Sequence, residues 1–367
     1  MQFGLSESQQ ILKDNARKFF ANECPMTEVR RVMETDTAYD ANLWRKMAEQ
    51  GFTGIIFPEE YGGLGLGKVE LALLMEEAGY ALLPGPFFST VAMAGALVDM
   101  CGTPEQKKKY LAPICNGDAR STVALLEASA SWDPTDAQMS GASGRLTGTK
   151  LFVPDAAGAG SIFVVCRDGI FIVDAGAPGL DIKPMSSMDL TRKLYSVQFS
   201  NTPAEKVGNP AGLPQARQIA TLALVSEMVG GMQRTLEITV QYAKTRKQFG
   251  NPIGMFQAVQ HQCADMYLET ESSRSAAYYA AWALEEKSPD AAASVSIAKI
   301  YASDACRTVG NRGIQIHGGM GFTWENDLHL YYRRAKASET MLGDPTYHRE
   351  RLARLVVDAD AGATTAK

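Results

Sequence analysis

One segment near the C-terminal end of a predicted helix combines residue types that suit a phosphate group. It runs from Tyr242 to Pro252 and contains Arg246, Gln248 and Phe249 before a turn with glycine and proline. Arginine offers a charged, forked donor for a phosphate, and an aromatic ring can lie against a flat group. Taken alone, the segment is better explained as a solvated basic helix end closed by a glycine.

A second segment, from Gln315 to Phe322, contains the glycines Gly318, Gly319 and Gly321. Clustered glycines allow backbone amides to approach an anion closely because no Cβ stands in the way. Taken alone, a plain turn between two helices explains this segment at least as well. Two such turns at the ends of predicted helices together favour a bound cofactor that contains a diphosphate.

The elements that must position these segments are helices. After Pro214, apolar residues recur at spacings of three and four, as one stripe of a long helix: Leu222, Val225, Val229, Met232 and Leu236. A second helix is predicted from about residue 256 to 284, a third from the Ser288-Pro289 pair to about 311, and a fourth from about 328. This pattern predicts a four-helix bundle over residues 213–357.

The rest of the chain has a different texture. Residues 1–120 read as helices broken by the glycine-rich segment Pro58–Gly65. In residues 121–212, short runs rich in β-branched and aromatic residues alternate with turn residues, which predicts antiparallel strands in a small barrel or sandwich. The predicted fold class is therefore α+β, with a helical domain, a β-domain, a bundle and a polar tail at 358–367.

Composition excludes several other classes of protein. A net charge of −5 argues against nucleic-acid binding, which needs a basic face. The six cysteines are scattered and none has ligand spacing with the four histidines, so no metal site is predicted. The start reads as an amphipathic helix capped by Ser6 and Gln9 rather than an export signal, and no apolar run is long enough to span a membrane. A reducing, cytoplasmic location is therefore expected.

These motifs resemble those of the acyl-CoA dehydrogenase family, and the resemblance extends along nearly the whole chain. The matching motifs, in order and at similar spacing, are Pro58-Glu-Glu-Tyr-Gly-Gly-Leu-Gly65, Arg246-Lys-Gln-Phe-Gly250 with Gln257, and His317-Gly-Gly-Met-Gly321. Three such matches in one order are not expected by chance. The family implies an N-terminal helical domain, a middle β-domain and a C-terminal four-helix bundle.

The resemblance also implies FAD as the cofactor, with its adenosine diphosphate half held by the bundle of a neighbouring subunit. The residues that this analogy assigns to the pyrophosphate and its surroundings are Arg246, Gln248, Phe249, Gln257, Gln315, Gly318, Gly319 and Gly321. All of them suit that role by type, so the ADP half of the site is predicted to be intact.

The half of the family's site that holds the flavin ring and the thioester is altered in this chain. Where the family has Thr-Glu-Pro-x-x-Gly-Ser-Asp, this chain has Leu126-Glu-Ala-Ser-Ala-Ser-Trp-Asp133. A leucine therefore replaces the hydroxyl that serves the flavin, and the bulky Trp132 replaces a small serine. The next flavin-contacting stretch, usually Trp-Ile-Thr, ends in Pro154, which offers neither a hydroxyl nor an amide donor.

The carboxylate that removes the α-proton in this family has no counterpart at either of its known positions. Most members carry a glutamate in a late turn, where this chain has Leu342, and a minority carry it on the first bundle helix, where this chain has Ala220. Asp344 is a weak candidate because its short side chain is expected to form a turn. Glu227 is too far along the helix, about 10 Å from Ala220. No catalytic base is therefore predicted.

An intact ADP half and an altered ring half suggest that another chain completes the site. The family includes bacterial α2β2 heterotetramers that act on acyl-CoA side chains of steroids, in which one subunit carries the glutamate and its partner lacks it. This chain is similar to that partner. The expected partners are a homologous catalytic subunit, an acyl-CoA substrate and an electron-transfer flavoprotein.

Three other functions stay open at this point. A self-sufficient homotetramer would need an atypical base, with Asp344 as its candidate. A flavin-dependent oxidase or monooxygenase on the same fold would not always need the glutamate. A non-catalytic binding or scaffold protein would have kept the fold without the flavin.

Overall fold

The computed structural model describes residues 4–358 of the 367-residue chain. Tertiary contacts divide the chain into two compact units. Of the described residues, the bundle unit comprises 4–26, 68–83 and 221–358, and the sheet unit comprises Thr27–Gly67 and Pro84–Ala220. The predicted domain boundaries at residues 120 and 212 stay predictions. The predicted tail, 358–367, lies outside the described residues apart from its first residue.

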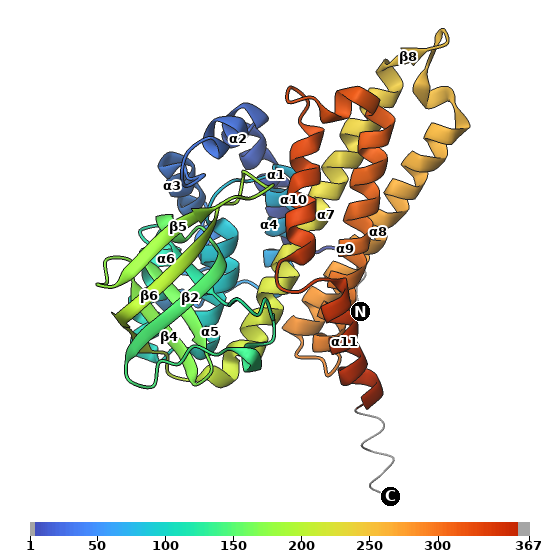
Figure 1. The fold of residues 1–367 in the computed structure, drawn as a ribbon. Coiled ribbons are helices and arrows are strands. Elements are labelled where there is room, and N and C mark those ends of the chain that lie inside the picture. Colours follow the sequence, from blue (N-terminus) through green and yellow to red (C-terminus); the bar gives the residue numbers. More distant parts are fainter. Residues whose placement is uncertain (1–3, 359–367) are drawn as a thin grey trace, which may run out of the picture. The chain divides into compact units, whose positions relative to one another are not determined.

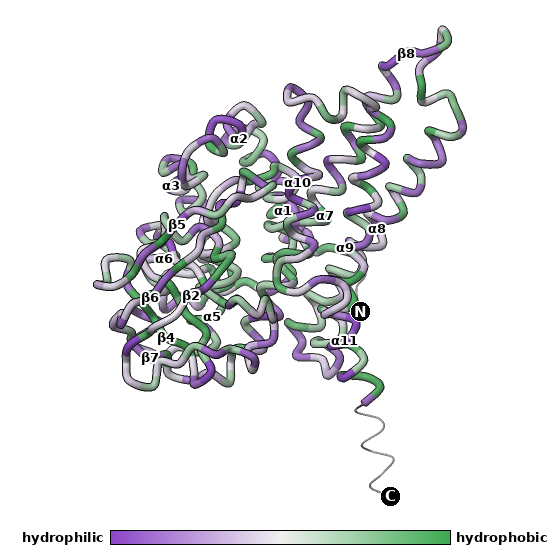
Figure 2. The backbone as a smooth tube through the Cα atoms, viewed as in Figure 1, coloured by the Kyte–Doolittle hydropathy of each residue, from purple (hydrophilic) through white to green (hydrophobic). Residues whose placement is uncertain are grey.

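Long helices form most of the bundle unit (Figure 1). They are α7 (Leu213–Thr245), α8 (Gln257–Glu285), α9 (Ala291–His317) and α10 (Leu328–Thr340), together with α1 (Glu7–Glu23), α4 (Lys68–Tyr80) and α11 (Pro345–Ala353). The first turns of α7, up to Ala220, group with the sheet unit. Along α8, hydrophilic and hydrophobic residues alternate, as expected of a helix with one buried face (Figure 2). The predicted four-helix bundle is confirmed, with α11 as a further helix.

Helices α4 and α7 approach so closely that their contact requires two glycines. A Cβ on Gly79 would lie 2.0 Å from the carbonyl oxygen of Glu227, and one on Gly230 would lie 1.8 Å from that of Glu76. Any larger residue would therefore push the two helices apart. Glu76 is buried beside this contact, and its carboxylate pairs with Arg274 of α8 at 3.1 Å, which ties α8 to α4.

The sheet unit contains two sheets whose inner faces share one core. The strands are β1 (Ser121–Ala124), β2 (Arg145–Pro154), β3 (Ser161–Cys166), β4 (Gly169–Asp174), β5 (Leu180–Met185), β6 (Leu194–Pro203) and β7 (Glu205–Lys206). The first sheet has the order β1-β3-β4-β7 and the second β2-β6-β5. Leu146, Phe171 and Phe199, from both sheets, belong to one buried cluster, as in a sandwich.

The pairing within these sheets is antiparallel, as predicted, with one exception. Strands β1 and β3 run parallel, with Ser121 opposite Ser161. The chain crosses to the second sheet as β2 and returns as β3, so β1 and β3 are not joined by a hairpin. Short helices complete this part of the chain: α2 (Met26–Met33), α3 (Ala41–Glu49), α5 (Ala96–Cys101) and α6 (Pro104–Cys115).

Two predicted helix starts have different outcomes. Ser6 and Gln9 form the predicted capping box of α1, with the Gln9 amide donating to Ser6 Oγ at 3.2 Å. The start of the third bundle helix at the Ser288-Pro289 pair is wrong, because α9 begins at Ala291. The Ala291 amide donates to the Ser288 carbonyl at 3.0 Å, which makes this segment a turn before the helix.

The described residues were also compared with the requirements of a membrane-spanning helix and of a metal site. Within residues 4–358, no helix is both long and apolar enough to cross a bilayer. In the same part of the chain, no group of three histidine, cysteine or acidic side chains is arranged to hold a metal ion. The cysteines are free thiols, and all but Cys263 are buried.

Candidate functional site

The segment with Arg246 forms an exposed hairpin beyond the end of α7 (Figure 1). β8 (Lys247–Gln248) pairs with β9 (Asn251–Pro252) across a tight turn in which Phe249 has a φ of 52°. The Ile253 amide donates to the Arg246 carbonyl at 2.8 Å and closes the hairpin on the helix end. Arg246 is exposed, and Phe249 is 89% exposed, so this chain leaves both side chains accessible.

The two amide side chains of the predicted site flank this hairpin. Gln248 is exposed on β8, and its side-chain nitrogen donates to the Lys247 carbonyl at 2.9 Å. Gln257 is exposed as the first residue of α8, directly after Phe256. The ring of Phe256 meets that of Phe249 edge to face, with centroids 6.2 Å apart. Both amides are therefore exposed, one in the hairpin and one at the start of α8.

The glycine-rich segment forms a 3-10 turn, Gly318–Phe322, directly after α9. Gly318 has a φ of 60° and a ψ of −139°, a backbone conformation that essentially only glycine adopts. A Cβ on Gly318 or Gly319 would meet no described heavy atom within 4 Å. Gly321 is different, because its Cβ would lie 3.1 Å from the Ile314 carbonyl oxygen. The open backbone at 318 and 319 leaves room for a ligand that approaches from outside the chain.

One aromatic contact connects the helix end before the hairpin to the helix end before the glycine turn. Tyr242, in the last turn of α7, stacks on His317, the last residue of α9, with centroids 4.2 Å apart and planes 21° from parallel. Gln315 is exposed in the same last turn of α9. The residues assigned to the ADP half thus lie together at what we term the bundle end, formed by residues 242–257 and 315–322.

The turn between α10 and α11 is ordered from several sides and has a leucine at its centre. Leu342 is 2% exposed and has a φ of 59°, an uncommon conformation for a bulky residue. A Cβ on Gly343 would lie 2.3 Å from the Tyr347 ring, and His348 Nε2 donates to the Leu342 carbonyl at 3.1 Å. Asp344 caps α11 by accepting from the Tyr347 amide at 2.8 Å. The Asp344 carboxylate is therefore engaged in ordering the turn.

A buried lysine holds the end of α10 immediately before this turn. Lys299 of α9 is fully buried, and its ammonium donates to the carbonyls of Ser338 and Glu339, each at 2.9 Å, and to Ser303 Oγ at 3.0 Å. The last carbonyls of a helix lack partners within the helix, and a cation there also faces the negative end of its dipole. Burial lowers the pKa of Lys299 to about 8. Lys299 therefore fixes where α10 ends.

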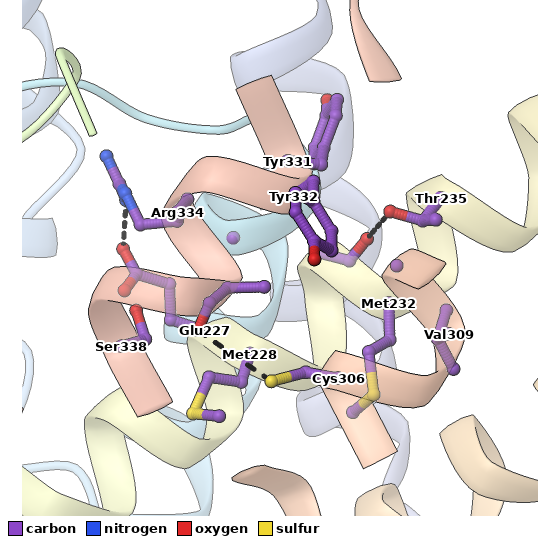
Figure 3. A pocket seen from close by; sticks show the side chains of 14 residues that line it. Glu227, Met228, Met232, Thr235, Cys306, Val309, Tyr331, Tyr332, Arg334 and Ser338 are labelled. Carbon is purple, nitrogen blue, oxygen red and sulfur yellow. Dashed lines mark hydrogen bonds and ion pairs between the residues drawn. The ribbon is translucent and has the colours of Figure 1, made fainter. Parts of the chain in front are cut away.

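The other position compared with the family's base, Ala220, and the nearby carboxylate of Glu227 both lie on α7. Glu227 of α7 pairs with Arg334 of α10 at 2.7 Å beside a small cavity inside the bundle unit (Figure 3). Both side chains are buried, and Arg334 also donates to the Leu83 carbonyl at 3.3 Å. A buried ion pair of this kind holds its carboxylate toward the arginine. Ala220 offers only a methyl group, buried in the part of α7 that belongs to the sheet unit.

In the sheet unit, the β1–β2 loop (residues 125–144) bonds to itself and to its flanking strands. The Glu127 carboxylate accepts from the amides of Gln138 and Met139 at 2.9 and 3.1 Å and pairs with Lys150 of β2 at 2.7 Å. Lys150 is fully buried and also donates to the Val165 carbonyl at 2.6 Å. Burial raises the pKa of Glu127, but its bonds to Lys150 and the two amides outweigh burial and hold that pKa below its usual value.

Other residues of the β1–β2 loop are also hydrogen-bonded within the sheet unit. Ser131 Oγ donates to Asp136 at 2.6 Å, and Arg217, at the start of α7, donates to the Trp132 carbonyl at 2.7 Å. Leu126 is buried, and its carbonyl accepts from the Leu151 amide at 2.9 Å. Hydrogen bonds therefore connect the loop to β2 and to the start of α7 as well as within itself.

The end of β2, next to this loop, presents an aromatic ring and a proline. Phe152 has a φ of 53° and is 45% exposed. Pro154 is buried and lacks an amide hydrogen, and its carbonyl accepts from Thr122 Oγ1 at 2.6 Å. Neither residue has a hydroxyl to offer a ligand.

Comparisons with known proteins agree on one family. Residues 6–118 match the acyl-CoA dehydrogenase N-terminal domain, and residues 218–357 match the acyl-CoA dehydrogenase C-terminal domain. Acyl-CoA dehydrogenase IpdE2 of Mycolicibacterium smegmatis is 31% identical over 354 residues, which cover 96% of this chain and 98% of that protein. The chain belongs to the acyl-CoA dehydrogenase family.

Solved structures share this fold across nearly the whole chain. A variant of the Tcur3481-Tcur3483 steroid ACAD is 32% identical, with a TM-score of 0.88 over 97% of this chain and 99% of that one. The ChsE4-ChsE5 complex from Mycobacterium tuberculosis is 28% identical, with a TM-score of 0.90 over 97% and 99%. PigA with FAD and proline is 26% identical, with a TM-score of 0.88 over 96% and 98%.

Several residues that contact these sites are not indicated by any pattern in the sequence. Lys299 and His348 order the turn around Leu342 from α9 and α11, and both are buried. Tyr242 and His317 lie within the two motifs, but nothing in their spacing indicates that the rings meet. The signal available in the sequence was weak: a lysine among apolar residues of a helix is more often a solvated residue than a buried one.

Proposed function

We propose that this chain is a subunit of an FAD-dependent acyl-CoA dehydrogenase that forms a double bond between the α and β carbons of an acyl-CoA thioester. In that assembly it supplies the ADP half of an FAD site, and a homologous partner chain supplies the catalytic glutamate and most of the flavin-ring site. One observation carries the proposal. The two positions at which the family places its base hold Leu342 and Ala220, both buried and apolar.

The bundle end supports the FAD half of this proposal. The residues proposed to contact the cofactor are Arg246, Gln248, Phe249, Gln257, Gln315, Gly318, Gly319 and Gly321. An exposed guanidinium suits the diphosphate, and the turn at 318–319 can bring its amides close because a Cβ there would meet nothing in the described chain. FAD, when bound, accepts the hydride that leaves the β-carbon. The donor set fits the cofactor that the family uses.

The other carboxylates near the candidate base positions support the absence of a base. A general base must reach the proton that it removes and must be free to accept it. Asp344 instead accepts the Tyr347 amide as the cap of α11, and Glu227 is paired with Arg334. Both carboxylates thus already accept hydrogen bonds from other residues of the bundle unit, which supports the partner chain as the source of the base.

The β1–β2 loop supports the proposal that the partner chain supplies most of the site for the flavin ring. In the family's pattern, hydroxyl groups in this loop and at the end of β2 meet the flavin and the thioester. Here the corresponding positions hold Leu126, Trp132 and Pro154, and the loop bonds within itself and to Arg217 of α7. A flavin ring placed against this loop would therefore meet few donors of the usual kind.

The named relatives support the choice of partner and substrate class. The similar Tcur3481-Tcur3483 steroid ACAD and the ChsE4-ChsE5 complex each pair two different chains by name. We therefore propose an α2β2 assembly with a homologous chain that carries the glutamate, and the side chain of a steroid, as its CoA thioester, as the substrate. An electron-transfer flavoprotein is the proposed electron acceptor. Free thiols throughout the chain fit a reducing, cytoplasmic location.

The decisive experiment compares the chain alone with the chain purified beside its homologous partner. We expect the lone chain to carry little flavin and to show no acyl-CoA oxidation. We expect the complex to hold FAD and to turn over, with the partner's glutamate essential. A lone chain with one flavin per copy and full turnover would overturn the proposal.

A substitution at Asp344 tests the self-sufficient homotetramer. An asparagine at this position would keep the side-chain oxygen that caps α11, so Asp344→Asn changes the charge while leaving the turn intact. The proposal expects turnover of the complex to be unchanged. Lost turnover with retained FAD would instead make Asp344 the base.

The same preparations distinguish the remaining alternatives. Oxygen consumption by reduced flavin without any CoA substrate would favour an oxidase or monooxygenase. Absence of flavin both alone and with the partner would favour a non-catalytic protein of the same fold.

A further inference from the structure

We propose that Tyr242 and His317 form a positioning pair that holds the Arg246 hairpin and the Gly318–Gly319 turn at the spacing one diphosphate group requires. The identity of the ligand in this inference rests on the proposed function. The contact between the two rings is seen in the bundle unit and does not depend on that proposal. Neither ring is proposed to contact the ligand, so both residues act through their neighbours.

The pair joins two segments that are far apart along the chain. The hairpin at 247–252 and the turn at 318–322 are separated in sequence by the whole of α8 and α9. Both project from the same end of the bundle unit, where α7 and α9 finish (Figure 1). The stacked rings lie one helical turn before the hairpin and directly before the glycines. The Tyr242 hydroxyl also donates to the His317 carbonyl at 3.5 Å, a long hydrogen bond.

On the side of α9, His317 is fixed to the glycine turn. Its ring is 4% exposed, and its Nδ1 donates to the Gly313 carbonyl at 2.9 Å. A Cβ on Gly321 would lie 3.1 Å from the Cβ of His317, so the turn folds back tightly on this residue. Burial lowers the pKa of His317, against the opposing effect of the bond to Gly313. Movement of His317 would therefore move the turn.

On the side of α7, Tyr242 is fixed to the hairpin. The Arg246 amide donates to the Tyr242 carbonyl at 2.8 Å, and the Arg246 carbonyl accepts from the Ile253 amide at 2.8 Å. A Cβ on Gly254 would lie 3.0 Å from the Ala243 carbonyl oxygen, so the segment after the hairpin packs on the same helical turn. The backbone of Arg246 is therefore held between Tyr242 and the returning strand.

A diphosphate site assembled from two separate turns depends on their spacing. Donors that are about 1 Å out of place lose much of their effect on a bound group. The stacked rings link the helix end that carries the hairpin directly to the residue before the glycines. An aromatic pair contributes about 0.5–1.5 kcal/mol beyond its buried area, which corresponds to a roughly two- to tenfold change in affinity.

The test uses the full-length chain with four substitutions. His317→Ala and Tyr242→Leu remove the stack from either side. His317→Phe keeps an aromatic ring and removes only the Nδ1 bond. Tyr279→Leu is the matched control, because Tyr279 is an exposed tyrosine of α8 whose ring meets Trp282 at 5.6 Å and not the bundle end. Thermal unfolding of each variant identifies any that fail to fold.

Two measurements are made on each variant that folds. Hydrogen exchange is followed at the turn opposite the substitution, because a purely local defect would not reach it. We expect at least severalfold faster exchange at 246–253 in His317→Ala and at 318–322 in Tyr242→Leu. ADP affinity is measured by calorimetry on the flavin-free complex of the chain with its homologous partner, with an expected loss of about two- to tenfold for the same variants. His317→Phe should restore most of both, and Tyr279→Leu should change neither.

Two outcomes separate this inference from the proposed function. If the wild-type complex binds ADP and the complexes with the stack-removing variants bind it equally well, or if exchange at the opposite turn is unchanged, the positioning pair is overturned. If the wild-type complex binds no ADP while exchange at the opposite turn still responds, the rings couple the turns but the proposed ADP site is overturned.

Discussion

The bundle end and the β1–β2 loop differ in whether their polar groups are exposed or bonded within the chain. At the bundle end, Arg246 is exposed and the glycines at 318 and 319 have open space where a Cβ would stand. In the β1–β2 loop, the carboxylate of Glu127 bonds to two amides and to a buried lysine. One region leaves donors exposed, and the other engages several of its polar groups in bonds within the chain.

This difference coincides with the pattern of substitutions relative to the family. The bundle end has the residue types predicted to suit a diphosphate, whereas the loop has Leu126 and Trp132 at positions where the resemblance to the family predicts hydroxyl residues. The turn at Leu342 resembles the loop, because Lys299, His348 and Asp344 order it from within. A protein that contributes half of a composite site would be expected to show this division.

Removing the carboxylate of Glu127 tests the loop and should give the largest effect. Glu127→Ala leaves Lys150 buried without its partner, so the free energy of unfolding should fall by about 3–5 kcal/mol. Urea denaturation followed by circular dichroism measures the change. The control is Asp181→Ala, which breaks an exposed pair with Lys183 in the same unit and should cost less than about 1 kcal/mol. Equal costs for the two variants would show that the loop is not held by its buried pair.

The next effect is a pH dependence due to Lys299. Its pKa is about 8 in the folded chain and 10.5 ordinarily, so between these values the unfolded chain binds more protons. Wild-type stability should therefore rise from pH 8 to 10.5 relative to Lys299→Met, by up to about 3 kcal/mol, because the buried charge is lost. Denaturation of both proteins at several pH values measures this gap. A gap that does not vary with pH would contradict the buried, desolvated position of this ammonium.

Replacing Arg246 tests the bundle end and separates binding from stability. Arg246→Ala should weaken ADP binding roughly 10- to 100-fold, because a charge-assisted, forked donor is lost. The unfolding free energy should change by less than about 0.5 kcal/mol, because the side chain is exposed. Lys247→Ala, in the same hairpin, is the control and should alter binding only slightly. A large loss of stability in Arg246→Ala would mean that this residue, like Glu127, serves the fold.

The smallest expected effect is at Asp344. Asp344→Ala removes the cap of α11 and should cost about 1 kcal/mol of stability, whereas Asp344→Asn should cost less. Neither substitution should reduce turnover of the complex with its partner beyond the loss of folded protein. Calorimetric melting and an acyl-CoA oxidation assay on the same samples provide the comparison. A loss of turnover larger than the loss of folded protein explains would show that Asp344 takes part in catalysis and does not only cap α11.

Local patterns in the sequence determined much of the fold and the location of the bundle end. The apolar stripe from Leu222 to Leu236 lies on α7, and the Ser6 and Gln9 capping box starts α1 where predicted. Both depend on contacts between residues three or four apart, which a single sequence displays directly. The two motifs that suit a diphosphate are also local, because each is one turn at a helix end.

Only the tertiary structure decided which polar groups are already in use. Glu227 and Arg334 are 107 residues apart in sequence, and Lys299 bonds to carbonyls about 40 residues away. The parallel pairing of β1 with β3 and the stacking of Tyr242 on His317 likewise join residues that no local pattern connects. Residue type indicates what a side chain can bind. Whether it is free to bind depends on neighbours that only the folded chain brings within hydrogen-bonding distance.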